Sequence, residues 1–276
     1  MEKAETQSPQ ESRKKGSSKF KWVAISLVFI VLLFVAYYYI MTAKAAKNWA
    51  ADFDAKYTET IKQSDSAVMR LFTDSTFRAL QKKIAFTKAK LELTKADPIG
   101  LSIDLTDSIS RLEVNGVTVH SSQIKEIDIC QSLYGVEPYF LSLELSKPLK
   151  IASEVATIPK EPILVKTAPK DTIEAAKAAS VPDTATTGPV YFEMTFENGF
   201  RLLVLQESDN KSFINRDLMK FLYSIRAARV RNNLKSILKF KVPSYSPEIV
   251  LVVPGWEAKT IYRAVPENGL VALRIY

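Results

Sequence analysis

The chain has 276 residues, of which 47% are hydrophobic and 25% charged, and its formal net charge is +8. This balance provides enough apolar side chains for a buried core and excludes a chain that is disordered throughout. The single cysteine, Cys130, excludes an intramolecular disulfide, a four-cysteine zinc cluster and a Cys-x-x-Cys redox pair. Packing must therefore stabilise the fold.

Residues 1–20 are rich in Lys, Glu, Gln and Ser, which predicts a short disordered tail. The next stretch, WVAISLVFIVLLFVAYYYIM (Trp22–Met41), carries no charge. A helix of that length, at about 1.5 Å per residue, spans the roughly 30 Å hydrocarbon layer of a bilayer. Trp22 and Tyr37–Tyr39 stand at its ends, as in aromatic belts. We therefore predict a transmembrane helix over residues 21–43.

Two other interpretations of this stretch stay open. One is a buried core helix, although a soluble helix is rarely apolar all round. The other is a cleaved signal peptide, for which Ala43–Ala46 offers only a mediocre cleavage site.

The flanking basic residues predict the orientation of the span. Three follow it nearby, Lys44, Lys47 and Lys56, and six precede it: Lys3, Arg13, Lys14, Lys15, Lys19 and Lys21. We expect a single-pass protein of the cytoplasmic (inner) membrane, with its N-terminus in the cytoplasm and the following 235 residues outside it, in the periplasm if the source has two membranes. The near absence of cysteine fits an oxidising compartment.

Residues 44–97 are predicted to form a helical membrane-proximal segment. Apolar side chains recur at helical spacing, first at Trp49, Phe53, Tyr57 and Ile61, and later at Leu80, Ile84 and Leu91. The N-cap residues of Thr73–Thr76 indicate a break between two helices, which form either a stalk or a hairpin. These apolar side chains form a stripe along the helices. The stripe mediates either self-association or packing against the core of the following domain, and we favour the second.

From residue 98 to 276 we expect a β-rich domain, which makes the fold class α+β. Apolar residues alternate in 100–105, 111–120, 124–129 and 139–145, and Asn115-Gly116 predicts a tight hairpin turn. The alternating acids are interpreted as exposed strand residues rather than metal ligands: Asp104, Asp107, Glu113, Glu126 and Asp128.

Residues 150–189 contain five prolines and are predicted to be an extended connection or exposed loop. A binding arm or a wall-spanning tether is possible in function, and a variable insertion is the interpretation that we favour. A short helix is expected within these residues at TIEAAKAA. A second hairpin turns at Asn198-Gly199, helix follows over 212–240, and the strands PEIVLVVP and GLVALRIY flank a helical turn. Both β regions are expected to share one sheet system.

Charge is concentrated between Arg216 and Lys241, which contain eight basic residues and one acid. Such a surface attracts anions, here wall carboxylates, lipopolysaccharide phosphates or a membrane surface, while a solvated helix face is the plainer interpretation. Nucleic acid is not expected, because no aromatic residue interrupts the basic run after Tyr223 until Phe240. The candidate anion-binding residues are Arg226, Arg229, Arg231, Lys235 and Lys239.

No pattern in the sequence indicates a cofactor, a metal site or a phosphate-binding loop. Cys130 and His120, the only histidine, could form a thiolate and its base if strand pairing brought them together. However, a lone cysteine after an alternating strand is typically a small buried residue, so we predict no catalytic residue.

Two stretches resemble the catalytic domain of L,D-transpeptidases, which crosslink or anchor to bacterial peptidoglycan. IGLSIDLTDSISRLEVNGVTV is similar to that domain's first hairpin, and WEAKTIYRAVPENGLVALRI is similar to its final helix and strand; together they cover about 40 of 276 residues. The family's Ser-[His/Arg]-Gly-Cys stretch is missing, because Cys130 stands in DICQSLYG with no histidine downstream. The resemblance implies a relative without the active site, acting as a binding or scaffolding module.

The sequence therefore favours a non-enzymatic envelope protein that contacts the bilayer and an anionic wall or lipid component, or else a membrane partner or a second copy. A cysteine-dependent transpeptidase-like enzyme is the alternative.

Overall fold

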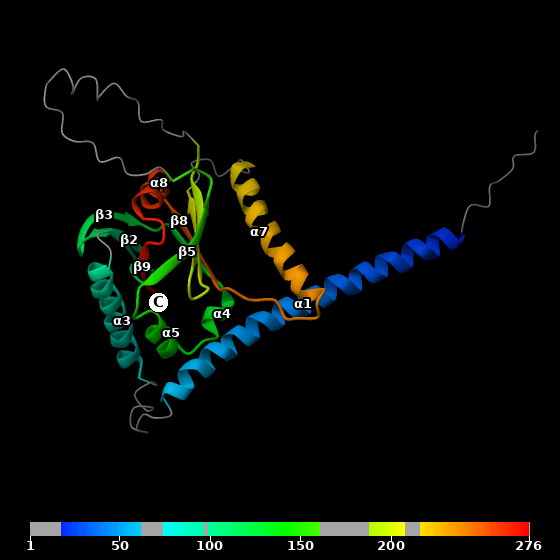
Figure 1. The fold of residues 1–276 in the computed structure, drawn as a ribbon, viewed down its shortest axis with the longest axis horizontal. Coiled ribbons are helices and arrows are strands. Elements are labelled where there is room, and N and C mark those ends of the chain that lie inside the picture. Colours follow the sequence, from blue (N-terminus) through cyan, green and yellow to red (C-terminus); the bar gives the residue numbers. More distant parts are fainter. Residues whose placement is uncertain (1–17, 62–73, 97–98, 161–187, 208–215, 276) are drawn as a thin grey trace, which may run out of the picture.

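The computed structural model describes residues 18–61, 74–96, 99–160, 188–207 and 216–275. The fold is a mixed α+β architecture with a long apolar N-terminal helix, as predicted (Figure 1). The helices are α1 (Ser18–Ile61), α3 (Ser75–Ala96), α4 (Gln131–Tyr134), α5 (Pro138–Glu144), α7 (Arg216–Ile237) and α8 (Gly255–Ala264). The strands are β1 (Ile99–Asp104), β2 (Ile109–Val114), β3 (Val117–Gln123), β4 (Glu126–Ile129), β5 (Leu149–Ala156), β6 (Tyr191–Phe196), β7 (Arg201–Gln206), β8 (Glu248–Val253) and β9 (Leu270–Arg274).

Helix α1 runs without interruption from the apolar stretch into the domain. Every side chain from Trp22 to Ala36 is exposed, and among the described residues only this helix has the length and composition to cross a membrane. From Tyr37 onward one face becomes covered, and Phe53 belongs to the main core. The first apolar stripe of the membrane-proximal segment therefore packs against the domain, as we favoured.

Helix α3 begins where the sequence indicated a break. The Asp74 carboxylate accepts a hydrogen bond from the backbone N–H of Thr76 at 2.7 Å, as an N-cap residue does. The stripe expected here to be buried is not the one that packs: Leu80 and Leu91 are more than half exposed. Instead the opposite face is buried through Phe86, Ala89 and Leu93.

The strands form one sheet in the order β3-β2-β1-β9-β5-β6-β7-β8-β4. The pairs β1/β9 and β7/β8 are parallel, and all other neighbours are antiparallel. Both predicted hairpin turns are confirmed. Asn115 and Gly116 have φ of 50° and 81°, and Gly199 has φ of 87°, a region that Gly and Asn tolerate best.

The two edge strands of that order, β3 and β4, are separated in the chain only by Ile124 and Lys125. An extended connection of two residues spans only about 7 Å. The sheet must therefore curl so that the end of β3 lies close to the start of β4. The main core lies inside the curl and includes side chains of α8 as well as both halves of the sheet. Helix α3 covers β9 from outside through Phe86 and Ala89, and α7 covers β6 and β7 through Phe221 and Ile225.

Three sequence predictions about the domain are wrong. Residues 139–145 form helix α5, not a strand, with Pro138 at its first turn. The first part of the proline-rich insert forms strand β5, which pairs with β6 and β9; residues 161–187, including the expected short helix, lie outside the described residues. The predicted tail lies outside them up to residue 17, and α1 begins at Ser18.

The third error concerns the acids that were expected to be exposed. Asp104 and Glu113 are 3% and 1% exposed, respectively, because α3 covers the sheet face that carries them. Each has a partner that offsets its desolvation: Arg274 Nη1 lies 2.9 Å from Asp104, and Lys90 Nζ lies 2.7 Å from Glu113.

Candidate functional site

Helix α7 carries four of the five predicted anion-binding residues, and Lys239 follows two residues after the helix ends. One stripe of the helix is apolar and buried: Phe221 and Ile225 pack against Tyr191 of β6 and Leu203 of β7. This stripe holds α7 flat on the outer face of the sheet. The opposite side of the helix is left to face outward.

Arg229 does not belong to that outward side, contrary to the sequence prediction. Its guanidinium forms an ion pair with Glu193 of β6 and a second with Glu248 of β8, at 2.5 Å in the second case. Arg201 of β7 lies beside this cluster and donates to the backbone carbonyl of Ser246 at 2.8 Å. Burial and the charge of Arg229 lower the pKa of Arg201, while the two glutamates act against this. The cluster fixes α7 to the sheet and leaves Arg229 with its charge already matched.

The other four predicted residues are exposed, namely Arg226, Arg231, Lys235 and Lys239. Large apolar side chains stand among them, and their exposed fractions are 56% for Met219, 76% for Tyr223, 49% for Val230, 62% for Leu238 and 83% for Phe240. We call these four basic and five apolar residues together the α7 surface. Its apolar members were missed, although the spacing of Met219, Tyr223 and Val230 by four and seven residues was a signal in the sequence.

The α7 surface lies next to the long N-terminal helix. The C-terminal end of α7 meets α1 near the middle of that helix, and α7 leads away from it to one side (Figure 1). In the same region, the ring of Tyr245, which follows α7, lies 6.0 Å from the ring of Trp49 in α1. The basic helix is thus held beside the point where α1 changes from fully exposed to partly covered.

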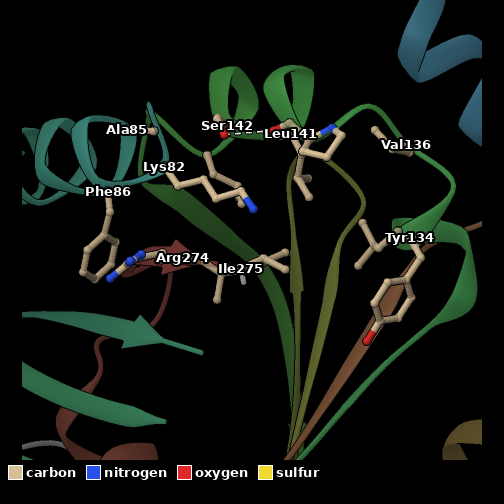
Figure 2. A pocket seen from close by; sticks show the side chains of 13 residues that line it. Lys82, Ala85, Phe86, Tyr134, Val136, Leu141, Ser142, Arg274 and Ile275 are labelled. Atoms are coloured by element: carbon tan, nitrogen blue, oxygen red, sulfur yellow. Dashed lines mark hydrogen bonds between the residues drawn. The ribbon is translucent and has the colours of Figure 1, made fainter. Parts of the chain in front are cut away.

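A second feature is a pocket of about 470 Å³, including its open side, between α3, α4, α5 and β9. Its wall is mostly apolar, with Leu141 and Ile275 among the lining residues, and the Lys82 side chain extends into the space that Figure 2 shows. Burial lowers the pKa of Lys82, and the nearby charges of Arg78 and Arg274 lower it further. Chemically, the pocket suits a small apolar group beside a cation.

Cys130 and His120 are not brought together. The Cys130 Sγ lies 3.2 Å from Ser132 Oγ and accepts a hydrogen bond from the backbone N–H of Glu248 at 3.3 Å. The His120 Nε2 lies 2.5 Å from Glu257 Oε2, and its ring packs edge-on against Trp256. The strand β3 pairs with β2 and the strand β4 pairs with β8, so strand pairing does not place these two residues opposite each other.

In the described part of the chain, no three His, Cys, Asp or Glu side chains gather as a metal site would require. Comparison with known proteins gives no further assignment: no family model, no curated protein and no solved structure matches the chain. The similarity to L,D-transpeptidases stays a prediction from the two stretches that carry it.

Proposed function

We propose that this is a single-pass membrane protein of the cell envelope, whose domain outside the cytoplasm binds anionic groups through the α7 surface. The N-terminus then lies in the cytoplasm and α1 spans the cytoplasmic membrane. One observation carries the proposal: three exposed basic side chains on α7 and a fourth, Lys239, just after its end lie beside the helix that has the length and composition of a membrane span.

Some other cations of the domain are already engaged with carboxylates and offer less of their charge to a ligand. Lys90 and Arg274 are paired with buried carboxylates, as is Arg229. Asp217, the one acid of α7, lies near Lys220 at 3.8 Å, in the first turn of the helix. The remaining field of α7 is positive, and the affinity it gives must fall as salt screens it.

The test uses the full chain in detergent micelles, applied to immobilised peptidoglycan and to beads coated with phosphatidylglycerol across a salt series. Exchanging Arg226, Arg231 and Lys235 for Gln should abolish retention on the matrix that binds the chain. The matched control exchanges Lys83, Lys88 and Lys95, three exposed lysines of α3, for Gln and removes the same charge. Equal losses in both variants, or no retention at low salt, would refute the proposal.

The location is tested separately by a reporter enzyme fused after residue 276. Activity that requires export supports a domain outside the cytoplasm, and activity restricted to the cytoplasm reverses the topology and with it the choice of ligands. Persistence of residues 1–43 in the mature chain, measured by intact mass, distinguishes the membrane anchor from a cleaved signal peptide.

For the alternative function, a cysteine-dependent transpeptidase-like enzyme, the described residues place no histidine or carboxylate in hydrogen-bond contact with Cys130 Sγ. The single histidine of the chain is engaged with Glu257 and Trp256, and the described neighbours of Cys130 Sγ are the hydroxyls of Ser132 and Tyr245 and a backbone amide. Cys130→Ala and His120→Ala in the source cell test this alternative. Altered peptidoglycan crosslinks in both variants would restore it.

A further inference from the structure

We infer that the partner of the α7 surface is the bilayer that α1 itself spans, with α7 lying on the membrane surface and Leu238 and Phe240 entering its interfacial layer. The inference rests on the proposed function and names the ligand of the same site. The chemistry is that of an anionic lipid surface, which offers both negative head groups and apolar depth.

The first step is the height of the domain along α1. The uncharged stretch ends at Met41, and the side chains of α1 begin to be partly buried at Tyr37. These two residues are about 6 Å apart along a helix axis. The nearest parts of the domain therefore stand at the level where the tyrosines of an aromatic belt lie, and no stalk separates the domain from the membrane.

The second step is the position of α7 within the domain. Figure 1 shows α7 on the side of the sheet that is turned toward the apolar half of α1, and its C-terminal end contacts α1. The helix extends sideways from that contact and does not run along α1. If α1 crosses the bilayer, the outward side of α7 faces the membrane surface.

The third step is the composition of that outward side. Tyr223 on α7 and Phe240 just after its end are 76% and 83% exposed, and with the three other apolar members they form a patch of the kind that marks an interaction surface. Interfacial helices combine such apolar side chains with Lys and Arg, because the apolar groups enter the head-group boundary while the cations meet anionic lipids. The exposed Lys44 and Lys47 add positive charge on α1 at the same level.

The end of α7 adds an independent observation. Phe240 has φ of 55°, in the left-handed region that helix termini usually reserve for Gly. The backbone N–H of Lys241 donates a hydrogen bond to the carbonyl of Ser236 at 3.0 Å. This bond caps the C-terminal end of α7. The chain thus keeps a large, exposed aromatic ring at a position where its side chain is sterically unfavourable. Burial of the ring in the bilayer interface supplies the compensating gain.

The occupants that compete with the bilayer explain less of the surface. A wall polymer matches the cations but offers nothing to the five apolar side chains. A second copy of the chain would bring a second positive surface against the first, which like charges oppose. Both remain distinguishable in the experiment.

The experiment places single nitroxide labels on the full chain in nanodiscs that contain phosphatidylcholine and phosphatidylglycerol. Cys130 is exchanged for Ser, and cysteines are introduced one at a time as Phe240→Cys, Leu238→Cys and, as control, Val119→Cys. Val119 is 61% exposed on β3, which lies on the far side of the sheet from α7 (Figure 1). Membrane-soluble oxygen and a water-soluble nickel chelate then report the surroundings of each label.

We expect labels at 238 and 240 to be several-fold less accessible to the nickel chelate and more accessible to oxygen than the label at 119. Equal nickel accessibility at 240 and 119 would overturn the inference. Shielding from both reagents, with dipolar broadening between labels, would assign the surface to a second copy and overturn it as well.

The bead assay separates this result from the proposed function. If the labels are in water while retention on peptidoglycan still depends on Arg226, Arg231 and Lys235, the inference is overturned and the proposed function stands. If the labels lie in lipid but the triple exchange changes neither label depth nor retention, the bilayer contact stands as a purely apolar one and anion binding is refuted.

Discussion

The hydroxyl of Tyr57 donates a hydrogen bond to the carboxylate of Glu144, which joins the end of α1 to the end of α5. Lys56 Nζ and Asn198 Nδ2 also donate to this carboxylate, at 3.0 and 3.2 Å. Burial acts to raise the pKa of Glu144, but the three hydrogen bonds outweigh it and the pKa lies below its ordinary value. One carboxylate therefore connects the long N-terminal helix, α5 and the turn between β6 and β7.

Removing the Tyr57 hydroxyl tests this connection. We expect Tyr57→Phe to lower the free energy of unfolding by about 1 kcal/mol, because Glu144 keeps two of its three donors. Denaturant titration of the full chain in detergent micelles, followed by tryptophan fluorescence, measures the change. Tyr223→Phe is the matched control, since that hydroxyl belongs to a side chain 76% exposed. An equal effect of both exchanges would contradict the assigned role.

The same carboxylate predicts a dependence on acid. A carboxyl whose folded pKa is depressed below the unfolded value of 4.5 stabilises the fold above that value, and the stabilisation is lost as pH falls through the folded pKa. Glu144→Gln should therefore be less stable than wild type at pH 7, and the difference should shrink once the pH is below 4.5. Thermal unfolding at the two pH values gives the comparison. Glu197→Gln, with a side chain 57% exposed, should show no such convergence.

Arg229 and Arg226 are three residues apart on α7, but we predict that their exchange for Met affects different properties. The first exchange should lower stability and the second should weaken anion binding. Arg229→Met leaves Glu193 and Glu248 without their cation beneath the helix, and should cost about 3 kcal/mol, the lower end for breaking a buried ion pair. Arg226→Met should change stability by no more than about 0.5 kcal/mol and should instead weaken anion binding. Denaturation midpoints test this, and adding Glu193→Gln and Glu248→Gln to Arg229→Met should restore part of the loss.

Gly100 marks the closest approach of β1 to α3. A Cβ at this position would lie 2.2 Å from Leu93 Cδ2, so Gly100→Ala should cost about 1–3 kcal/mol through overpacking. At Gly188 no heavy atom lies within 4 Å of the added Cβ, so Gly188→Ala should be tolerated. In a Leu93→Ala background, Gly100→Ala should add little further loss in a thermal unfolding assay. Additive losses would exclude the contact as the cause.

Elements with local signals were predictable from the sequence. The Asn-Gly turns specify both hairpins through backbone conformations that few residue pairs adopt, and α1 is identified by its uncharged length. Residues 139–145 carried an ambiguous signal, because Leu141 and Leu145 fit both an alternating strand and a helix of four-residue spacing. Pro138 at the first turn and packing against α3 decide for helix.

The errors at charged residues have one physical origin. Sequence spacing shows that Asp104 and Arg229 share a face with their neighbours, but not what covers that face. Arg274 lies 170 residues from Asp104, and Glu193 lies 36 residues from Arg229. Partners at such distances become visible only when the sheet and its covering helices are placed, which is why one of the five predicted anion-binding residues turned inward.

The position of β9 has a consequence for how the chain folds. This strand is the last of the described strands, yet it lies between β1 and β5 and so joins the two halves of the sheet. Its neighbours cannot be united before it has been synthesised, because no other described strand pairs with both of them. Until then β1 and β5 each present an unpaired edge, which is open to aggregation and to proteases. The described sheet is therefore completed only when β9 has been added, however early α1 forms.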